Sequence, residues 1–417
     1  MKAASLIVVA ALSLCVTPGS IAKDTVLLPR QQNNCGNVRV QTKSVSPVKN
    51  SQGDRDGAAQ KDEDRKTSAR SEHPIDLVIC LDTSNSMDGL IGAAKEKIWD
   101  IVNELATAKP KPHLRVGLYA YGTPGFGTQN GFVHKVVELS DDLDKVFTEL
   151  TGLRTNGGDE YCARVISTAT DQQPWTDRKG LKILVVAGNE SATQDPKLNV
   201  FETAKNAISH GIVINTIYCG NPAHPEANDW RKIATAADGQ FASIDQNSGT
   251  VVISTPFDRK LGELSAAINS TYLAYGREGY QGQQKQLAAD SASRSMGSAN
   301  FASRAAAKVS GQYRNSSWDL LDASKAKSFD LKKIKNEELP PEMQRMSAEQ
   351  QKDYVSKKSQ ERADIQKQIA ELNTQRAKFI QDEIKKTGRS TDKAFDAAML
   401  KALRDQAQRS GFTFDSK

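Results

Sequence analysis

Between residues 74 and 273, runs of apolar residues alternate with amphipathic stretches. Continuous apolar runs of strand length are typical of strands buried on both faces of a sheet. Six segments are predicted as strands on this pattern: 75–81, 114–121, 131–139, 181–187, 212–218 and 240–244. Apolar residues three or four apart, as at Ile91, Ala94 and Ile98, predict helices between them, and a closing helix is predicted over 257–268. The alternation predicts a doubly wound α/β domain with a mainly parallel, six-stranded, Rossmann-like sheet, whose ligands bind at the carboxyl ends of the strands.

Residues 1–22 have the pattern of a secretory signal peptide. A positively charged start precedes the apolar run 6–16, which is too short to span a bilayer, and small residues lead to a cleavage site after Ala22. A lipoprotein anchored at Cys15 is the alternative, but the bulky Leu14 argues against it. The mature chain is therefore expected to be periplasmic or secreted, without a transmembrane segment.

The segments on either side of the α/β domain differ in composition. Residues 23–73 are polar and charged, which predicts a disordered linker because they cannot bury enough apolar surface to offset chain entropy. Residues 274–417 are predicted to be helical, with 277–312 read either as a helix on the domain or as a linker. An apolar stripe over 347–387 predicts a long helix that pairs as a coiled coil or a helical hairpin.

Charge is unevenly spread along the 417 residues. Residues 258–417 hold 29 Lys and Arg and 21 Asp and Glu, a balance of +8, whereas the first 257 hold the remaining 27 and 29, a balance of −2. The excess would allow the tail to contact anionic lipid, lipopolysaccharide or peptidoglycan, but mixed charges on solvated helix faces explain it more simply. No concentrated basic patch points to nucleic acid.

Composition and motifs also argue against several function classes. A hydrophobic content of 38% and a mean hydropathy of −0.54 exclude a multi-span membrane protein. Five His and five Cys argue against a multi-histidine metal enzyme. The chain has no Gly-x-Ser-x-Gly elbow, no His-Glu-x-x-His and no phosphate loop, so we predict no catalytic residues.

The first predicted strand leads into Asp82-Thr83-Ser84-Asn85-Ser86, directly before a helix. One carboxylate and two hydroxyls are hard oxygen donors, suited to Mg²⁺, Ca²⁺ or Mn²⁺ rather than to thiolate-seeking metals. The alternative is that these side chains only cap the helix. The turn predicts a divalent-cation site made by Asp82, Ser84 and Ser86.

This Asp-x-Ser-x-Ser pattern, with its strand before and its helix after, resembles the von Willebrand factor A domain. The resemblance implies a bound Mg²⁺ whose last ligand is an acidic side chain of a protein partner, which explains binding without catalysis. It also implies a Thr ligand after a Gly-Gly pair, where this chain has Asp159, with Thr155 the less favoured substitute. A third loop, which carries an Asp in the family, here has Asn189 and Glu190, either of which would lean in directly or through water.

The segments Gly157–Cys162 and Ala187–Glu190 also resemble a subgroup of exported bacterial proteins with this domain. In the family's strand order Cys80 lies too far from Cys219 for a disulfide. We therefore predict a Cys162–Cys219 disulfide that braces the metal face, with Cys80 reduced and Cys35 free; the alternative is that all four are reduced.

These features predict an exported, divalent-cation-dependent protein-binding module of the adhesion type in the bacterial cell envelope. The partner would offer an acidic side chain. One alternative is a metal-independent structural or assembly protein that uses its helical tail. Another is an unrecognised hydrolase.

Overall fold

The computed structural model describes residues 73–177, 179–244, 253–387 and 399–414. The predicted signal peptide and all but the end of the predicted linker lie outside these ranges. Among the helices of the described ranges, none is both long and apolar enough to cross a membrane.

A six-stranded sheet in the order β3-β2-β1-β4-β5-β6 forms the centre of the α/β domain. Its strands are β1 Pro74–Asp82, β2 His113–Tyr121, β3 Val133–Ser140, β4 Leu181–Gly188, β5 Ile212–Tyr218 and β6 Phe241–Ser243. All pairings are parallel except that of the edge strand β3, which runs antiparallel to β2. All nine residues of β1 are buried, as expected for a central strand covered on both faces. The predicted fold class is confirmed.

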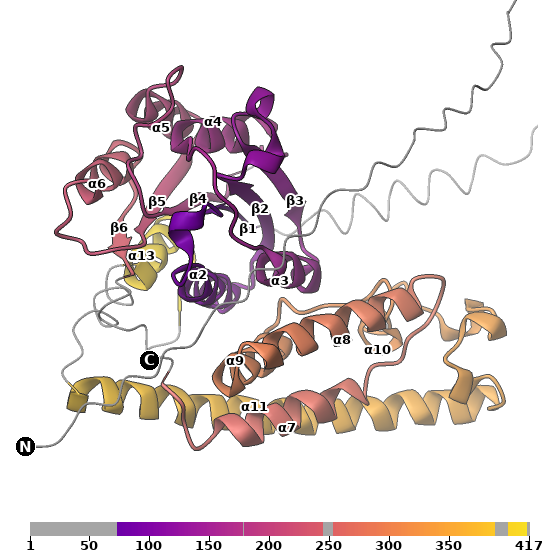
Figure 1. Ribbon diagram of the computed structural model, residues 1–417. Helices are drawn as coiled ribbons and strands as arrows, with labels where there is room; N and C mark the ends of the chain where they lie inside the picture. Colours follow the sequence, from indigo (N-terminus) through magenta and orange to yellow (C-terminus); the bar gives the residue numbers. More distant parts are fainter. Residues whose placement is uncertain (1–72, 178, 245–252, 388–398, 415–417) are drawn as a thin grey trace, which may run out of the picture. The chain divides into compact units, whose positions relative to one another are not determined.

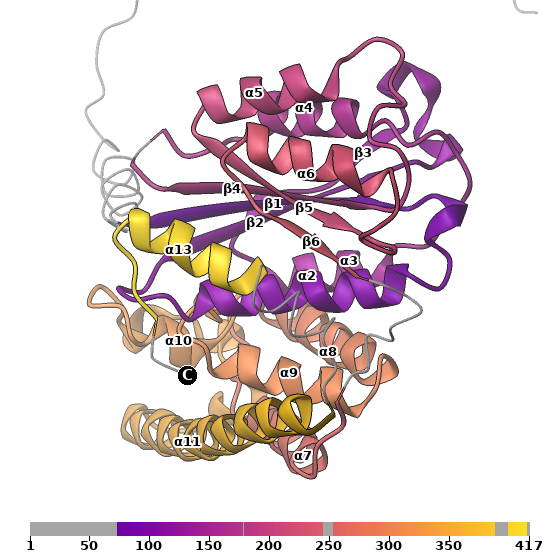
Figure 2. The same ribbon diagram turned by 90° about the vertical axis from the view of Figure 1, so that its left-hand side faces the viewer.

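Helices cover both faces of this sheet (Figures 1 and 2). On one face lie α4 Cys162–Gln172, α5 Val200–Ser209 and α6 Ala227–Ala236. On the other face lie α2 Ile91–Ala106 and α3 Leu143–Gly152. The carboxyl ends of the parallel strands therefore meet at one edge of the layers. The sequence order reverses around β1, and such a reversal is where open α/β sheets place their ligands.

The end of the chain completes the α/β domain. Helix α13, Lys401–Arg409, lies beside α2 on the same face of the sheet (Figure 2). Four buried side chains of this segment join the core of that face: Met399, Leu403, Ala407 and Phe412. The Gln406 side chain exchanges hydrogen bonds of 2.9 and 3.1 Å with Asn215 on β5. Lys109 and Thr413 pair their backbones at 2.6 and 2.7 Å.

The predicted domain boundary at residue 273 needs correction. The helix predicted to close the domain is α7, Asp258–Asn269, and its apolar face packs in a separate core with Ala302 and Ile369. The sheet is instead closed by residues 399–414, which return after an inserted helical region. Sequence periodicity shows that a helix has an apolar face, but it does not show which core that face enters.

The helical region contains α7, α8 Gly279–Ser295, α9 Ser298–Val309, α10 Leu320–Ala323 and α11 Ala348–Thr387. The polar stretch left open above as helix or linker forms α8 and α9. The bounds of α11 agree with the long helix predicted over 347–387.

The apolar stripe of α11 is covered by its own chain. Ile365, Ile369 and Leu372 pack in one core with the apolar face of α7. Arg362 lies buried in the middle of α11 and forms an ion pair of 2.7 Å with Asp319. Among the described residues this stripe is therefore used for packing within the chain, and the prediction of a coiled coil is not supported.

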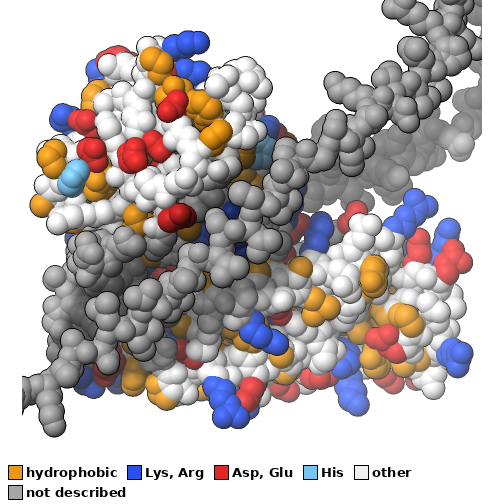
Figure 3. Space-filling model, viewed as in Figure 1, with side chains coloured by type: hydrophobic (Ala, Val, Ile, Leu, Met, Phe, Trp, Pro, Cys, Tyr) orange, Lys and Arg blue, Asp and Glu red, His pale blue; other side chains and the backbone are white. Residues whose placement is uncertain are grey.

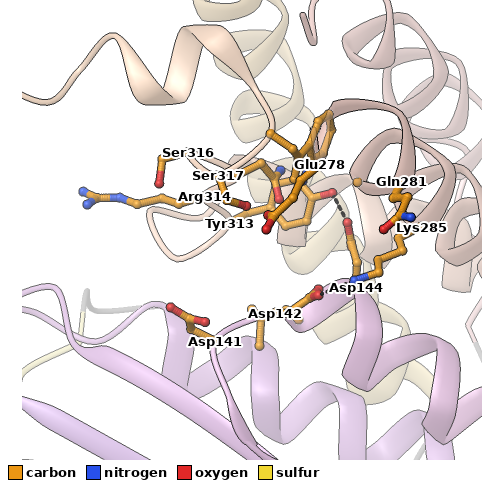
Figure 4. Close-up of a pocket in the computed structure, with 14 residues that line it drawn as sticks. Asp141, Asp142, Asp144, Glu278, Gln281, Lys285, Tyr313, Arg314, Ser316 and Ser317 are labelled. Carbon is orange, nitrogen blue, oxygen red and sulfur yellow. Dashed lines mark hydrogen bonds and ion pairs between the residues drawn. The ribbon is translucent and has the colours of Figure 1, made fainter. Parts of the chain in front are cut away.

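A buried ionic network joins the helical region to α3. Arg304 on α9 is fully buried, binds Asp144 in the first turn of α3, and donates to Asp290 on α8 at 3.0 Å. Tyr313 donates to Asp144 as well (Figure 4), and Lys308 pairs with Asp290. Burial alone would raise the pKa of Asp290, but Lys308 and Arg304 lower it below its ordinary value. Buried ion pairs thus connect the helical region to α3 of the α/β domain. Removing one charge of such a pair would leave the other buried without its partner.

Candidate metal centre

The turn after β1 brings three oxygen-bearing side chains to the carboxyl edge of the sheet. Asp82 is the last residue of β1, and its Oδ1 accepts a 2.8 Å hydrogen bond from the Ser84 amide. Thr83 anchors the turn, because its hydroxyl donates to the Tyr121 carbonyl on β2 at 2.8 Å. The 3₁₀ helix η1, Asn85–Met87, follows and carries Ser86.

The two serine hydroxyls form a pair that Asn189 holds in place. Their Oγ atoms lie 2.8 Å apart, and Ser86 Oγ donates to Asn189 Oδ1 at 2.9 Å. Asn189 follows β4 and returns a 2.9 Å bond from Nδ2 to the Ser86 carbonyl. Because Ser86 gives its proton to Asn189, Ser84 is the donor of the serine pair, and one lone pair of Ser86 remains for another partner. Asn189 thus positions a donor of the site and adds no negative charge.

Asp82 is the most informative member of the group. It is 1% exposed, and its Oδ2 is buried without a hydrogen-bond partner. Burial raises the pKa of the Asp82 carboxyl to about 7; hydrogen bonds from Ser84 lower it, and the charges of Glu160 and Glu190 raise it. A buried carboxylate oxygen with no partner is costly in water-excluded surroundings, and a cation beside it would remove that cost.

Glu160, rather than Asp159, faces this group. Asp159 is exposed, and its Oδ2 accepts only a 3.3 Å bond from the Tyr161 hydroxyl. Glu160 is buried, and Gln194 donates to its Oε2 at 2.9 Å. Burial and the charge of Glu190 raise the pKa of Glu160, while hydrogen bonds from Gln194 and Ser84 lower it. The acid that points toward Asp82 is therefore Glu160, the residue directly after the predicted ligand Asp159.

The other predicted candidates lie at the margin of the site. The Thr155 hydroxyl is bound to Asp88, so Thr155 does not replace the family's Thr. Glu190 is half-buried; its Oε2 accepts from Gln194 at 3.1 Å and its carbonyl accepts from Trp230 at 2.8 Å. Its charge reaches Asp82, which makes it an electrostatic neighbour of the site.

Gly122, directly after β2, makes room for this arrangement. Its φ of +83° belongs to the left-handed region that favours glycine. A Cβ atom at Gly122 would lie 2.8 Å from Asp82 Oδ1, 3.2 Å from Glu160 Cγ and 3.3 Å from Ser84 Cβ. These three side chains therefore surround one point, and the glycine was a signal that sequence reasoning overlooked.

The donor set suits a hard divalent cation held partly by hydroxyls. Among the residues that the structure describes, no three His, Cys, Asp or Glu side chains converge as a metal-binding group. A cation here would accordingly depend on one or two carboxylates and on the Ser84 and Ser86 oxygens. Such oxygen donors fit Mg²⁺, Mn²⁺ or Ca²⁺, and they fit no soft metal preferentially.

The predicted Cys162–Cys219 disulfide is wrong. Both residues are free, buried thiols, as is Cys80 on β1. Cys162 packs in the core on the α4 face of the sheet, whereas Cys219 packs with Ile217 in the core on the α2 face. Burial raises the pKa of both thiols, which disfavours the thiolate needed for oxidation. Cys35 lies outside the described residues.

A second concave feature lies between the amino end of α3 and the helical region (Figure 4). Its volume is about 380 Å³, and its walls are mainly polar. Lys285 pairs with Asp142 across it at 3.4 Å, and Asp144 is already bound by Arg304 and Tyr313. These acids have partners within the chain, so we place the candidate site at the strand ends.

The face that carries η1 is turned toward the viewer in Figure 1. Seen from this side, Asp and Glu side chains occupy the middle of the surface of the α/β domain, and Lys and Arg lie mostly at its margins (Figure 3). A surface of one sign raises the local concentration of counter-ions.

Comparison with protein families identifies the domain. The family model of the von Willebrand factor type A domain matches residues 76–259, a range that includes all six strands except the first residues of β1. No curated protein sequence matches the chain.

Among solved structures, the conserved hypothetical protein BatB from Bacteroides thetaiotaomicron is 18% identical; the match covers 41% of this chain and 90% of that one, with a TM-score of 0.32. The pilus adhesin SpaC from Lactobacillus rhamnosus GG is 14% identical, covering 42% and 28%, with a TM-score of 0.33. Proximal thread matrix protein 1 from the mussel byssus, with a zinc-occupied MIDAS motif, is 11% identical, covering 42% and 42%, with a TM-score of 0.32.

Proposed function

Given that residues 76–259 belong to the von Willebrand factor type A family, we propose that this domain binds a protein partner through a divalent cation. Asp82, Ser84 and Ser86 would hold the cation, and Asn189 would orient Ser86. The cation would supply an electrophilic centre for an oxygen ligand. The proposal includes no catalytic residue.

The buried, unpartnered Oδ2 of Asp82 is the observation that carries the proposal. It lies on the same carboxylate as Oδ1, which the Ser84 amide fixes, so the carboxylate cannot turn toward solvent without breaking that bond. The two hydroxyls beside it lie 2.8 Å apart, and Ser86 donates to a neutral amide at 2.9 Å. A helix-capping role would instead leave these side chains bonded to backbone amides of the helix, and neither serine caps η1 or α2 by a side-chain bond.

We propose further that the mature protein acts in the bacterial cell envelope or outside the cell. The predicted signal peptide of residues 1–22 supports this placement. The alternative of assembly through the helical tail lacks an observation in its favour, because the apolar stripe of α11 is covered by α7. The hydrolase alternative likewise lacks an observation in its favour, because Ser86 donates its proton to the Asn189 amide and not to a general base.

A thermal melt in Mg²⁺ tests the cation. At a concentration of Mg²⁺ about 100 times its dissociation constant, binding adds roughly 2.7 kcal/mol to the free energy of unfolding. For a protein of this size we expect the midpoint to rise by roughly 5–10 °C over the value in EDTA. Asp82→Ala is expected to show no rise.

Asp159→Asn is the matched control, since it removes an exposed carboxylate from the adjacent loop and is expected to keep the full shift. Equal melts in Mg²⁺ and EDTA for the wild type, or an equal rise in Asp82→Ala, would refute the cation site. The same proteins, immobilised, test the partner: an envelope protein should be retained by the wild type in Mg²⁺, released by EDTA, and not retained by Asp82→Ala.

A further inference from the structure

Glu160 is a buried acid beside the proposed cation donors. It lies in the loop between α3 and α4, where the family carries a neutral Thr ligand, and it is buried against Asp82 and Ser84. Its Cγ, the Asp82 Oδ1 and the Ser84 Cβ all lie within 3.3 Å of the position that a Cβ on Gly122 would take. An acidic side chain of the protein's own chain is thus next to the proposed cation donors.

Gln194 keeps Glu160 in this place. Its Nε2 donates to Glu160 Oε2 at 2.9 Å and to Glu190 Oε2 at 3.1 Å, so that one amide group bridges two carboxylates. Carboxylates held close together repel each other unless a positive charge is near. A cation beside Glu160 would relieve this repulsion, and Asp82, whose Oδ2 has no partner, feels the charges of both glutamates.

The distribution of charge explains the departures from the family pattern. The third loop has the neutral Asn189 where the family carries an Asp, so one negative charge is missing there. Glu160 in the second loop restores it. Asp82 and Glu160 together balance the two charges of a divalent cation, whereas Asp82 alone does not.

Resting on the proposed function, we propose that Glu160 is a ligand that this chain supplies to its own cation, in the position that the family leaves for an acid of the partner. The site is then closed in the free protein. A carboxylate from a partner must displace Glu160, and it gains little attraction from a cation already neutralised by two carboxylates, with Glu190 beside it. The partner class that fits is an acidic side chain that binds only when the 153–161 loop moves Glu160 away.

Bound Mn²⁺ provides a direct test, because its enhancement of water-proton relaxation depends on the number of waters it keeps. We expect Glu160→Ala to weaken Mn²⁺ binding roughly 10- to 100-fold and to raise the relaxivity per bound ion, as water replaces the carboxylate. Added acetate should lower that relaxivity in Glu160→Ala and leave the wild type unchanged. Glu160→Gln, nearly identical in shape, should show the same loss of affinity and guards against a folding artefact.

Asp159→Asn controls for the loss of one charge from the same loop and should behave as the wild type. Mn²⁺ binding that requires Asp82 but has equal affinity and relaxivity in the wild type and both Glu160 variants would overturn the role of Glu160 and leave the proposed function standing. No Mn²⁺ binding to the wild type, or binding unaffected by Asp82→Ala, would overturn the proposed function and this inference with it.

Discussion

Truncation after Thr387 is expected to unfold the α/β domain, although it removes no strand. The lost segment contributes Met399, Leu403 and Phe412, each at most 2% exposed, to the core beneath the sheet. Burying a side chain of this size stabilises by roughly 1.5–3 kcal/mol. The three together therefore come to roughly 5–9 kcal/mol, which is comparable with the whole stability of a typical domain.

Circular dichroism and a thermal melt of the purified chain measure this effect. Truncation after Phe414 is the control, since it keeps every contact described for α13 and should melt as the full chain does. Leu403→Ala gives a milder version for the case that the truncated chain cannot be purified, with an expected loss of about 2–5 kcal/mol. A truncated chain that melts within about 2 °C of the full chain, which corresponds to less than about 1 kcal/mol, would show that α13 does not belong to this core.

Replacing Arg304 by Met is expected to destabilise the protein by about 3–5 kcal/mol. Methionine fills much of the same space, but buried Asp144 loses its ion pair and keeps only the hydrogen bond from Tyr313, while Asp290 keeps Lys308. A buried charge without a partner costs far more than the pair contributes. Urea denaturation, followed by fluorescence and by circular dichroism, gives the change in free energy of unfolding.

Arg259→Met is the matched control on α7, because Arg259 forms an ion pair of 3.3 Å with Glu263 while 92% exposed. It should change the stability by less than about 1 kcal/mol. Adding Asp144→Leu to Arg304→Met should recover part of the loss by removing one stranded carboxylate. If the second substitution adds a further loss equal to its own single effect, the cost lies in packing and the ionic explanation is wrong.

The sheet was predictable because its strands are buried on both faces. Ile75, Leu77 and Ile79 are fully buried in one core and Val78 and Cys80 in the other, so β1 reads as an unbroken apolar run. The turn that brings Asp82, Ser84 and Ser86 together was also predictable, since these residues follow that run without a gap.

The place of the last helix was not predictable from local pattern. Leu403 and Ala407 form an apolar stripe four residues apart, which would suit any core within reach. The Asn215–Gln406 hydrogen bonds, between residues 191 positions apart, connect it to β5, and no local sequence feature records such a pairing. The chain leaves the sheet after β6 and returns to it with α13. A domain boundary drawn along the sequence at residue 273 therefore separates α13 from the sheet that it covers.

The error at Cys162 and Cys219 comes from side-chain direction. Successive side chains of a strand point to opposite faces, so Cys219 shares the face of Ile217 and not that of Tyr218. The exposure of Asp159 has a similar origin. An alignment on Gly157 and Gly158 counts positions along the loop, whereas the direction of the backbone before α4 decides that Glu160 points inward.

Anomalous diffraction from crystals grown in Mn²⁺ is the most direct test of the cation site. We predict one strong manganese peak at the carboxyl end of β1, within coordination distance of Asp82 Oδ2 and of the Ser84 and Ser86 hydroxyl oxygens, and no such peak in crystals of Asp82→Ala. A map from saturated crystals with no peak there, in which both hydroxyls keep only their bonds to each other and to Asn189, would contradict it.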